Sequence, residues 1–260
     1  MNRIEQALKT KKQQNLKSFI GYFTAGDPSI EALPSIVGAL YRGGCDVIEM
    51  GIPFSDPLAD GPVIQAAGQR AIERGTTIYK IFECVATFRN TIQVPIAFLV
   101  YYNTLVIYGV EAFVQQCVKI GIDGLIIPDL PFEEQEELSH YLKNTSIALI
   151  PFATPTSKER MHFTLNQGQG FVYTVSSMGV TGRLSEFYKD LDTYVQEVRS
   201  YTTLPIAIGF GISTPDDVKR MGELADAVIV GTAIVKKIYE SKGDSDTIAG
   251  FVASLVEGLK

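Results

Sequence analysis

Cysteine and histidine are scarce in this 260-residue sequence, and neither is spaced for a metal or redox centre. The three cysteines, Cys45, Cys84 and Cys117, lie far apart, are odd in number and form no CxxC pair. This pattern is typical of buried, reduced thiols in the cytosol. His140 and His162 fall in stretches of helical spacing without a partner acid or cysteine, so we expect neither to be catalytic and expect no metal.

The sequence also lacks long apolar runs and any excess of positive charge. No stretch is long enough to cross a bilayer, and the first eight residues are typical of a short amphipathic helix rather than a signal peptide. Lys and Arg number 23 against 29 Asp and Glu, which gives a formal net charge of −6, and no Lys/Arg run is present. The sequence therefore predicts a soluble cytoplasmic protein that binds neither nucleic acid nor a membrane.

The glycine fingerprint of a dinucleotide-binding fold is missing as well. Gly209-Phe210-Gly211 is followed by Ile212-Ser213-Thr214, so the third glycine of GxGxxG is absent. This argues against an open, doubly wound sheet. Because metal, nicotinamide and lysine motifs are all lacking, the chemistry is expected to be proton transfer by carboxylates and to need no cofactor in this chain.

Eight short apolar runs alternate with stretches of helical spacing, as expected for strands that are covered on both faces. No linker rich in Pro or Ser divides them, and an Asp precedes three of the strands (Asp46, Asp123 and Asp226) in a weak internal repeat. We therefore predict an α/β fold: a single (β/α)8 TIM barrel domain over residues 1–260, with an extra N-terminal helix and a short phosphate-binding helix after strand 8. The predicted strands are 19–23, 47–51, 96–101, 124–127, 148–151, 171–175, 206–209 and 227–230.

A Pro-rich loop bracketed by two acids follows the second predicted strand. Glu49 lies inside the apolar run 47–51, and Asp60 stands at the end of the loop, before a helix that begins near Pro62. Either acid taken alone is commonly structural, as a paired buried acid or a helix cap. In a barrel, however, both would lie at the catalytic end of strand 2.

The two acids are expected to differ in protonation. Burial at the mouth of an apolar barrel raises the pKa of an acid, so Glu49 could carry a proton near neutral pH. Asp60, at the end of a polar loop, is expected to stay ionised and to accept a hydrogen bond. Such a difference separates an acid/base from an electrostatic partner.

Glycines recur in the loops after strands 6, 7 and 8, at 179–182, 209–213 and 231–233. Glycines in neighbouring loops allow backbone N–H groups to face an anion, and a helix that begins after Gly231 adds partial positive charge. Any one of these glycines could simply permit a tight turn. The three together predict a phosphorylated substrate.

Two further sets of residues are predicted to be functional, one in a substrate pocket and one on a loop surface. Tyr22, Tyr173, Leu99 and either Ile126 or Ile127 could line a flat apolar pocket, although ordinary barrel filling would explain each of them singly. The other set lies on the loop between the acids, where an apolar surface indicates either a lid over the acids or a partner interface. We assign Phe54, Asp56, Pro57 and Leu58 to that interface.

Over its full length the sequence resembles the tryptophan synthase alpha chain family. The motifs that carry the resemblance are Gly21–Pro28, Glu49–Pro62, Ile127–Pro131, Gly179–Gly182 and Gly209–Ile212, and the second of them is highly specific. The resemblance implies that Glu49 and Asp60 are the two catalytic acids, and that Tyr173 contacts the substrate. Tyr22 stands where some relatives carry Phe. The implied phosphate contacts are Gly182, Phe210, Gly211, Gly231 and Thr232, and Thr181 is assigned to the substrate site beside them.

The resemblance also implies a reaction: retro-aldol cleavage of indole-3-glycerol phosphate to indole and glyceraldehyde 3-phosphate. It implies docking to a tryptophan synthase beta chain that holds pyridoxal phosphate and receives the indole, in an alpha2beta2 heterotetramer. Three alternatives stay open. They are a barrel isomerase acting on a phosphorylated sugar, a stand-alone lyase that releases indole, and a catalytically silent allosteric subunit.

Overall fold

The computed structural model describes residues 2–154, 158–174, 184–209 and 211–260. All paired strands run parallel in one sheet of order β5-β4-β3-β2-β1-β9-β8-β7-β6. The two ends of this order, β5 and β6, are consecutive in the chain and separated only by Ile150 and Pro151. Ile150 N–H donates to the Leu125 carbonyl on one side, and Tyr173 N–H donates to the Pro151 carbonyl on the other. The sheet therefore closes into a ring, and the predicted barrel is confirmed.

Of the fifth predicted strand, 148–151, only Ala148–Leu149 forms a strand, because Pro151 has no N–H to continue the ladder. A further short strand, Phe152–Ala153, follows and was not predicted. The other predicted strands are recovered within two residues at either end, and 47–51 and 227–230 match at both ends. The observed strands are β1 Ser18–Thr24, β2 Val47–Gly51, β3 Ile96–Leu99, β4 Gly124–Ile126, β5 Ala148–Leu149, β6 Phe152–Ala153, β7 Val172–Thr174, β8 Ile206–Ile208 and β9 Ala227–Val230.

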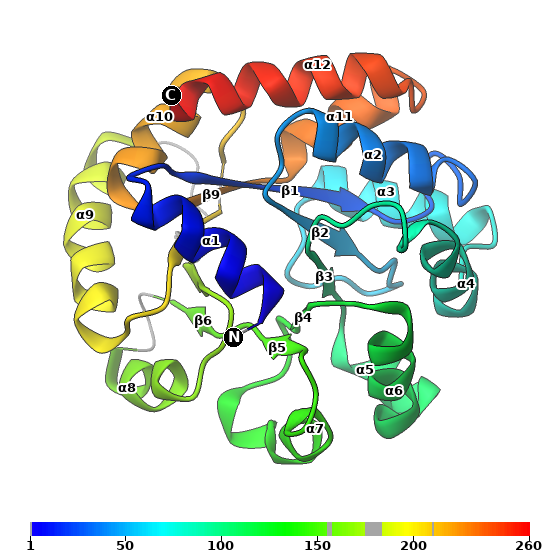
Figure 1. Ribbon diagram of the computed structural model, residues 1–260, viewed down its shortest axis with the longest axis horizontal. Helices are drawn as coiled ribbons and strands as arrows, with labels where there is room; N and C mark the ends of the chain where they lie inside the picture. Colours follow the sequence, from blue (N-terminus) through cyan, green and yellow to red (C-terminus); the bar gives the residue numbers. More distant parts are fainter. Residues whose placement is uncertain (1, 155–157, 175–183, 210) are drawn as a thin grey trace.

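Helices surround the ring of strands, and α1 crosses one end of it (Figure 1). The helix α5, which follows β3, was not predicted. The observed α-helices are α1 Arg3–Gln13, α2 Leu33–Arg42, α3 Pro62–Glu73, α4 Ile78–Phe88, α5 Tyr102–Tyr108, α6 Val110–Ile120, α7 Glu136–Leu142, α8 Lys158–Asn166, α9 Leu184–Tyr201, α10 Pro215–Leu224, α11 Thr232–Glu240 and α12 Ser245–Val256. Short 3-10 turns, η1 Phe132–Glu134 and η3 Glu257–Leu259, precede α7 and follow α12. Within the described ranges, none of the helices combines the length and hydrophobicity needed to span a bilayer.

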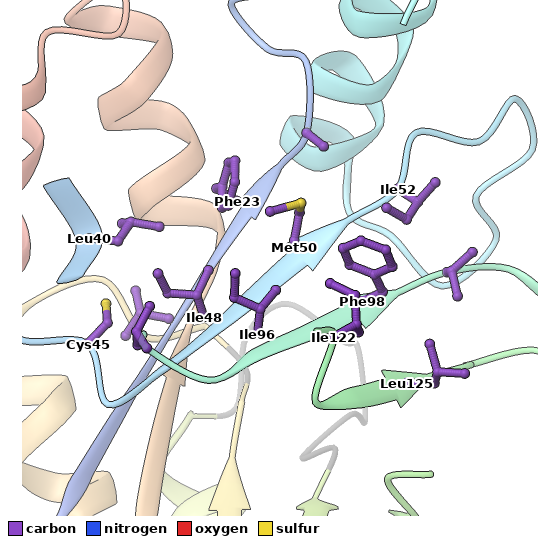
Figure 2. Packing of buried hydrophobic residues seen from close by; sticks show 14 of the residues in the cluster. Phe23, Leu40, Cys45, Ile48, Met50, Ile52, Ile96, Phe98, Ile122 and Leu125 are labelled. Atoms are coloured by element: carbon purple, nitrogen blue, oxygen red, sulfur yellow. The ribbon is translucent and has the colours of Figure 1, made fainter. Parts of the chain in front are cut away.

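The side chains of each strand alternate between two apolar layers. Ile48 and Met50 of β2 pack with Phe98 of β3 in the layer between the sheet and the helices, as Figure 2 shows. Val47, one position earlier, instead packs inside the barrel with residues of the other strands. Because successive strand residues point to opposite faces, Glu49 must share the interior side with Val47.

The N-terminal helix α1 closes the barrel at the ends where the strands begin. Its apolar residues Ile4 and Leu8 are buried in the interior cluster. Its cations pair with the three aspartates of the sequence repeat: Arg3 with Asp123 at 3.2 Å, Lys11 with Asp46 at 3.1 Å and Lys12 with Asp226 at 3.1 Å.

The three aspartates have one further role in common. Each accepts a backbone N–H from the start of a neighbouring strand: Asp46 from Phe19 at 2.9 Å, Asp123 from Ile96 at 2.8 Å and Asp226 from Ile206 at 2.9 Å. The repeat therefore joins adjacent strands to each other and to α1. The predicted N-terminal helix is confirmed, although it extends further than the eight residues expected.

The free thiols differ in burial. Cys45 and Cys117 are buried as expected, but Cys84 is only half-buried. Its thiol contacts the Ile30 carbonyl at 3.5 Å.

We expect Asp226→Asn to lower the free energy of unfolding by about 2 kcal/mol at pH 7, because charged hydrogen bonds are lost at a buried position. Burial alone would raise the pKa of Asp226, but the Ile206 N–H and the cations of Arg199 and Lys12 outweigh it, so the net pKa is lowered. The stabilisation is therefore present above the unfolded pKa of about 3.9 and is lost as the pH falls through the lower folded pKa.

Urea denaturation at several pH values checks this prediction. The matched control is Asp246→Asn, which disrupts the exposed pair between Asp246 and Arg42. The control should change stability by less than about 0.5 kcal/mol. Equal losses in the two variants would contradict the role of the repeat.

Candidate active site

A cavity of about 670 Å³ opens at the end of the barrel opposite α1, where the strands finish. Its size is in the range of sites for small molecules. The structure places many of the predicted site residues on its wall. They are Tyr22, Glu49, Asp60, Leu99, Tyr173, Gly211, Gly231 and Thr232. Thr181, Gly182 and Phe210 lie outside the described residues.

Glu49 is the most deeply buried acid of this cavity. Its side chain is 1% exposed, and neither carboxyl oxygen has a hydrogen-bond partner among the described residues. Burial, and then the nearby charge of Asp60, raise the pKa of Glu49 to about 8. At neutral pH Glu49 is therefore mainly protonated, as a proton donor requires.

Asp60 lies on the loop between β2 and α3 and is only partly buried. Burial raises its pKa to about 6, while a hydrogen bond from the Tyr101 side chain acts in the opposite direction. The pKa is higher than an ordinary aspartate's but remains below that of Glu49. At pH 7 the two acids therefore hold one proton between them, mostly on Glu49, and Asp60 is mainly ionised.

Two residues that were not predicted as site residues hold the loop that carries Asp60. The Tyr101 hydroxyl accepts the Ala59 N–H at 3.0 Å, and its ring stacks on Phe54 with 4.9 Å between centroids. Gln65 donates to the Asp60 carbonyl at 2.9 Å. Tyr101 is the last residue of the predicted strand 96–101, and Gln65 lies in the first turns of α3. Nothing in their spacing indicated that they would meet the loop.

The apolar part of the cavity is formed by Tyr22, Leu99 and Tyr173, and the Phe152 ring is tilted against Tyr173 with 5.2 Å between ring centroids. Neither Ile126 nor Ile127 lines the cavity, and Ile126 packs deeper in the barrel interior.

The Tyr22 hydroxyl lies 3.4 Å from Thr24 Oγ1. A Cβ on Gly51 would lie 2.2 Å from that hydroxyl, so the strand end must be glycine where Tyr22 is present.

The glycine-rich end of the cavity has room for an anion. Gly211 adopts a φ of +65°, and a Cβ added there would meet nothing within 4 Å. Gly231 precedes the first residue of α11, Thr232, so the positive end of that helix faces the cavity wall. A second cavity of about 540 Å³ also touches Gly211 and Thr232 and is lined by Lys236 and Lys237.

The loop between the acids exposes part of its predicted interface. Leu58 is 96% exposed, and Asp56 is also exposed. Pro57 and Phe54 are half-buried, and the Phe54 ring is engaged with Tyr101 rather than presented outward. The exposed apolar surface therefore centres on Leu58.

A sequence model of the family described as tryptophan synthase alpha chain matches residues 8–259. The chain belongs to this family. A tryptophan synthase alpha chain of Thermoanaerobacter sp. (strain X514) is 45% identical over 100% of both chains, and one of Alkaliphilus metalliredigens is 43% identical over 99% of this chain and 98% of its own. The solved tryptophan synthase subunit alpha of Legionella pneumophila str. Paris has a TM-score of 0.91 and 35% identity, covering 100% of this chain and 98% of its own.

Membership of the tryptophan synthase alpha chain family agrees with the barrel and with the motifs that carry the resemblance. The roles of individual residues stay predictions. Among the described residues, no group of three or more His, Cys, Asp or Glu is placed to hold a metal ion.

The first prediction for this alpha-chain site concerns the coupling of its two acids. Asp60→Asn removes the neighbouring charge, so the pKa of Glu49 should fall from about 8. It should stay well above that of an ordinary glutamate, because burial is the larger cause of the rise. Carboxyl ¹³C NMR titration of both proteins, with Glu49→Gln used to assign the signal, measures the effect. A Glu49 pKa that does not change in Asp60→Asn would show that the acids do not interact.

Proposed function

We propose that this chain is the alpha subunit of a tryptophan synthase and cleaves indole-3-glycerol phosphate to indole and glyceraldehyde 3-phosphate. The observation that carries the proposal is the pair of acids with separated pKa values, about 8 and about 6, on one wall of an apolar cavity. Family membership supports the same reaction. The chain would act as one barrel domain in the cytoplasm, with no cofactor of its own.

The protonated Glu49 carboxyl would give its proton to the ring carbon that bears the glycerol chain. The positive charge that develops on the ring is shared with the indole nitrogen. The Asp60 carboxylate would accept a hydrogen bond from the indole N–H and so stabilise this charge. Glu49, now ionised, would remove the proton of the adjacent glycerol hydroxyl. The O–H electrons form the aldehyde, the carbon–carbon bond breaks, and its electrons restore the aromatic ring. Glu49 regains its proton, so the cycle balances.

The two ends of the substrate would be held by different parts of the cavity. Tyr22, Leu99 and Tyr173 offer apolar surface for the indole ring. Gly211 and the start of α11 at Gly231 and Thr232 offer backbone N–H groups to the phosphate. The phosphate contacts that the resemblance implies at Gly182 and Phe210 would belong to the same end, and Thr181 would belong to the substrate site beside them. Binding energy at the phosphate would fix the reacting bond against the acids.

A tryptophan synthase beta chain, carrying pyridoxal phosphate, would receive the indole in an alpha2beta2 assembly. The exposed Leu58 and Asp56, with the adjoining Pro57, support a docking surface on the loop that ends at Asp60. Phe54 would contribute from within, since it is stacked on Tyr101. The same loop would then contact the beta chain on its outer side and the substrate on its inner side.

Release of indole from indole-3-glycerol phosphate tests the function, measured with and without a beta chain. Glu49→Gln should lower turnover by roughly 10²–10⁴-fold, because it removes the proton carrier. Asp60→Asn should lower it by roughly 10²–10³-fold, through loss of charge stabilisation. Both variants should still bind substrate.

Near-normal indole release by Glu49→Gln would exclude the assigned acid/base role. Full activity of the isolated chain, unchanged by a beta chain, would indicate a stand-alone lyase. No activity in either condition would indicate a silent subunit, or an enzyme with another substrate.

The phosphate end makes a separate prediction. Gly211→Asp should weaken binding of glycerol 3-phosphate by roughly tenfold or more, because it adds a negative charge beside the phosphate. Gly211→Ala is the matched control. It costs roughly 1–2 kcal/mol of stability for a side chain at positive φ, but its Cβ meets no neighbour. Calorimetric titration and thermal unfolding separate the two effects, and equal affinity in the two variants would exclude Gly211 from the phosphate site.

A further inference from the structure

Tyr101 contacts the loop from Ile52 to Asp60 near both its start and its end. The residue follows β3 and is 3% exposed. Its ring stacks on Phe54 near the start of the loop, with an interplanar angle of 16°. Its hydroxyl accepts the Ala59 N–H at 3.0 Å and donates to the side chain of Asp60 at the loop's end. One side chain therefore contacts the loop at both ends.

We infer that Tyr101 is a positioning residue for the proposed reaction: its ring fixes Phe54 while its hydroxyl fixes the Asp60 carboxylate, so that displacement of the loop's outer surface alters the hydrogen bond to Asp60. The inference rests on the proposed function. It adds a route by which contact at Phe54 or Leu58 reaches the acid, through a buried phenol rather than along the loop backbone.

The surroundings of Asp60 make this hydrogen bond important. The described groups whose charges interact with Asp60 are the acid Glu49 and the phenols of Tyr22, Tyr101 and Tyr173. Asp129, which acts electrostatically on Tyr101, is another acid. Among these groups there is no cation, so the Tyr101 hydroxyl is the side-chain donor that favours the ionised form of Asp60.

Gln65 supports the same loop in a different way. It donates to the carbonyls of Asp60 at 2.9 Å and Pro57 at 3.4 Å, so it holds the backbone and leaves the carboxylate alone. Its side chain is exposed. Of these two residues, only Tyr101 contacts both the Phe54 ring and the Asp60 carboxylate.

Three variants separate the two contacts. Tyr101→Phe keeps a ring to stack on Phe54 but removes the hydroxyl. Phe54→Leu removes the stacked ring and keeps the hydroxyl. Tyr102→Phe is the matched control: it removes the neighbouring phenol, which contacts Glu137 at 3.1 Å on the exposed side of α5.

The pH dependence of kcat/KM for indole release is the main measurement, because a merely structural loss would not move its acidic limb. In Tyr101→Phe this limb, which reports ionisation of Asp60, should shift upward by roughly one pH unit, since removing a donor to a carboxylate raises its pKa. At pH 6 activity should therefore fall more than at pH 8. Phe54→Leu should shift the limb in the same direction by less, and Tyr102→Phe should leave it in place.

The double variant Tyr101→Phe with Phe54→Leu tests whether the ring acts through the hydroxyl. Its acidic limb should coincide with that of Tyr101→Phe alone, because the contact that Phe54 steadies is already gone. A limb unmoved by Tyr101→Phe, or moved equally by Tyr102→Phe, overturns the inference. So does a double variant whose two shifts simply add.

Titration of Asp60 by ¹³C NMR in the absence of substrate keeps this inference distinct from the proposed function. An upward shift of the Asp60 pKa in Tyr101→Phe, in a protein that releases no indole, would leave the hydrogen bond established and reject the reaction. Active wild-type protein whose Asp60 titrates identically in Tyr101→Phe would reject the role of Tyr101 alone. Thermal unfolding of each variant confirms that the compared proteins are folded.

Discussion

The proposed chemistry depends on keeping the Glu49 carboxyl inside a barrel where no described group hydrogen-bonds to it. Such a group is costly to bury, and the cost falls mainly on its charged form. The surrounding strands supply the compensation, because Ile48 and Met50 on either side of Glu49 are fully buried in the outer layer (Figure 2). Two strong apolar anchors thus hold β2 in register while the residue between them points into the cavity and retains a proton.

The opposite end of the barrel supplies its acids with the hydrogen-bond partners that Glu49 lacks. There Asp46, Asp123 and Asp226 are satisfied by strand N–H groups and by cations of α1. Stability and chemistry are thereby separated along the barrel axis, as is general for this fold. An acid can remain without a partner at the mouth because the strand beginnings are fixed independently of it.

The sequence pattern was sufficient for the elements whose signals are local. The limits of β2 and β9, the two bracketing acids and the repeat of aspartates all follow from the order of neighbouring residues. The interruption at Pro151 and the helix α5 did not follow, because they depend on how the barrel closes and on what covers its rim. Tyr101 was hidden for the same reason: it meets Ala59 across 42 residues of sequence, and no spacing rule describes such a contact.

The composition of the loop between the acids suits a loop in which contact at its outer surface must affect the position of Asp60. Pro53 and Pro57 restrict its backbone, and Pro62 begins the helix that follows, so few alternative conformations compete with the observed one. A flexible loop would absorb a push at Leu58 by local rearrangement. A stiff loop fixed to β2 at its start and to α3 at its end must instead move its remaining contacts. Of those, the one that touches a carboxylate is Tyr101, so stiffness in the backbone makes a side-chain hydrogen bond sensitive to the outer surface.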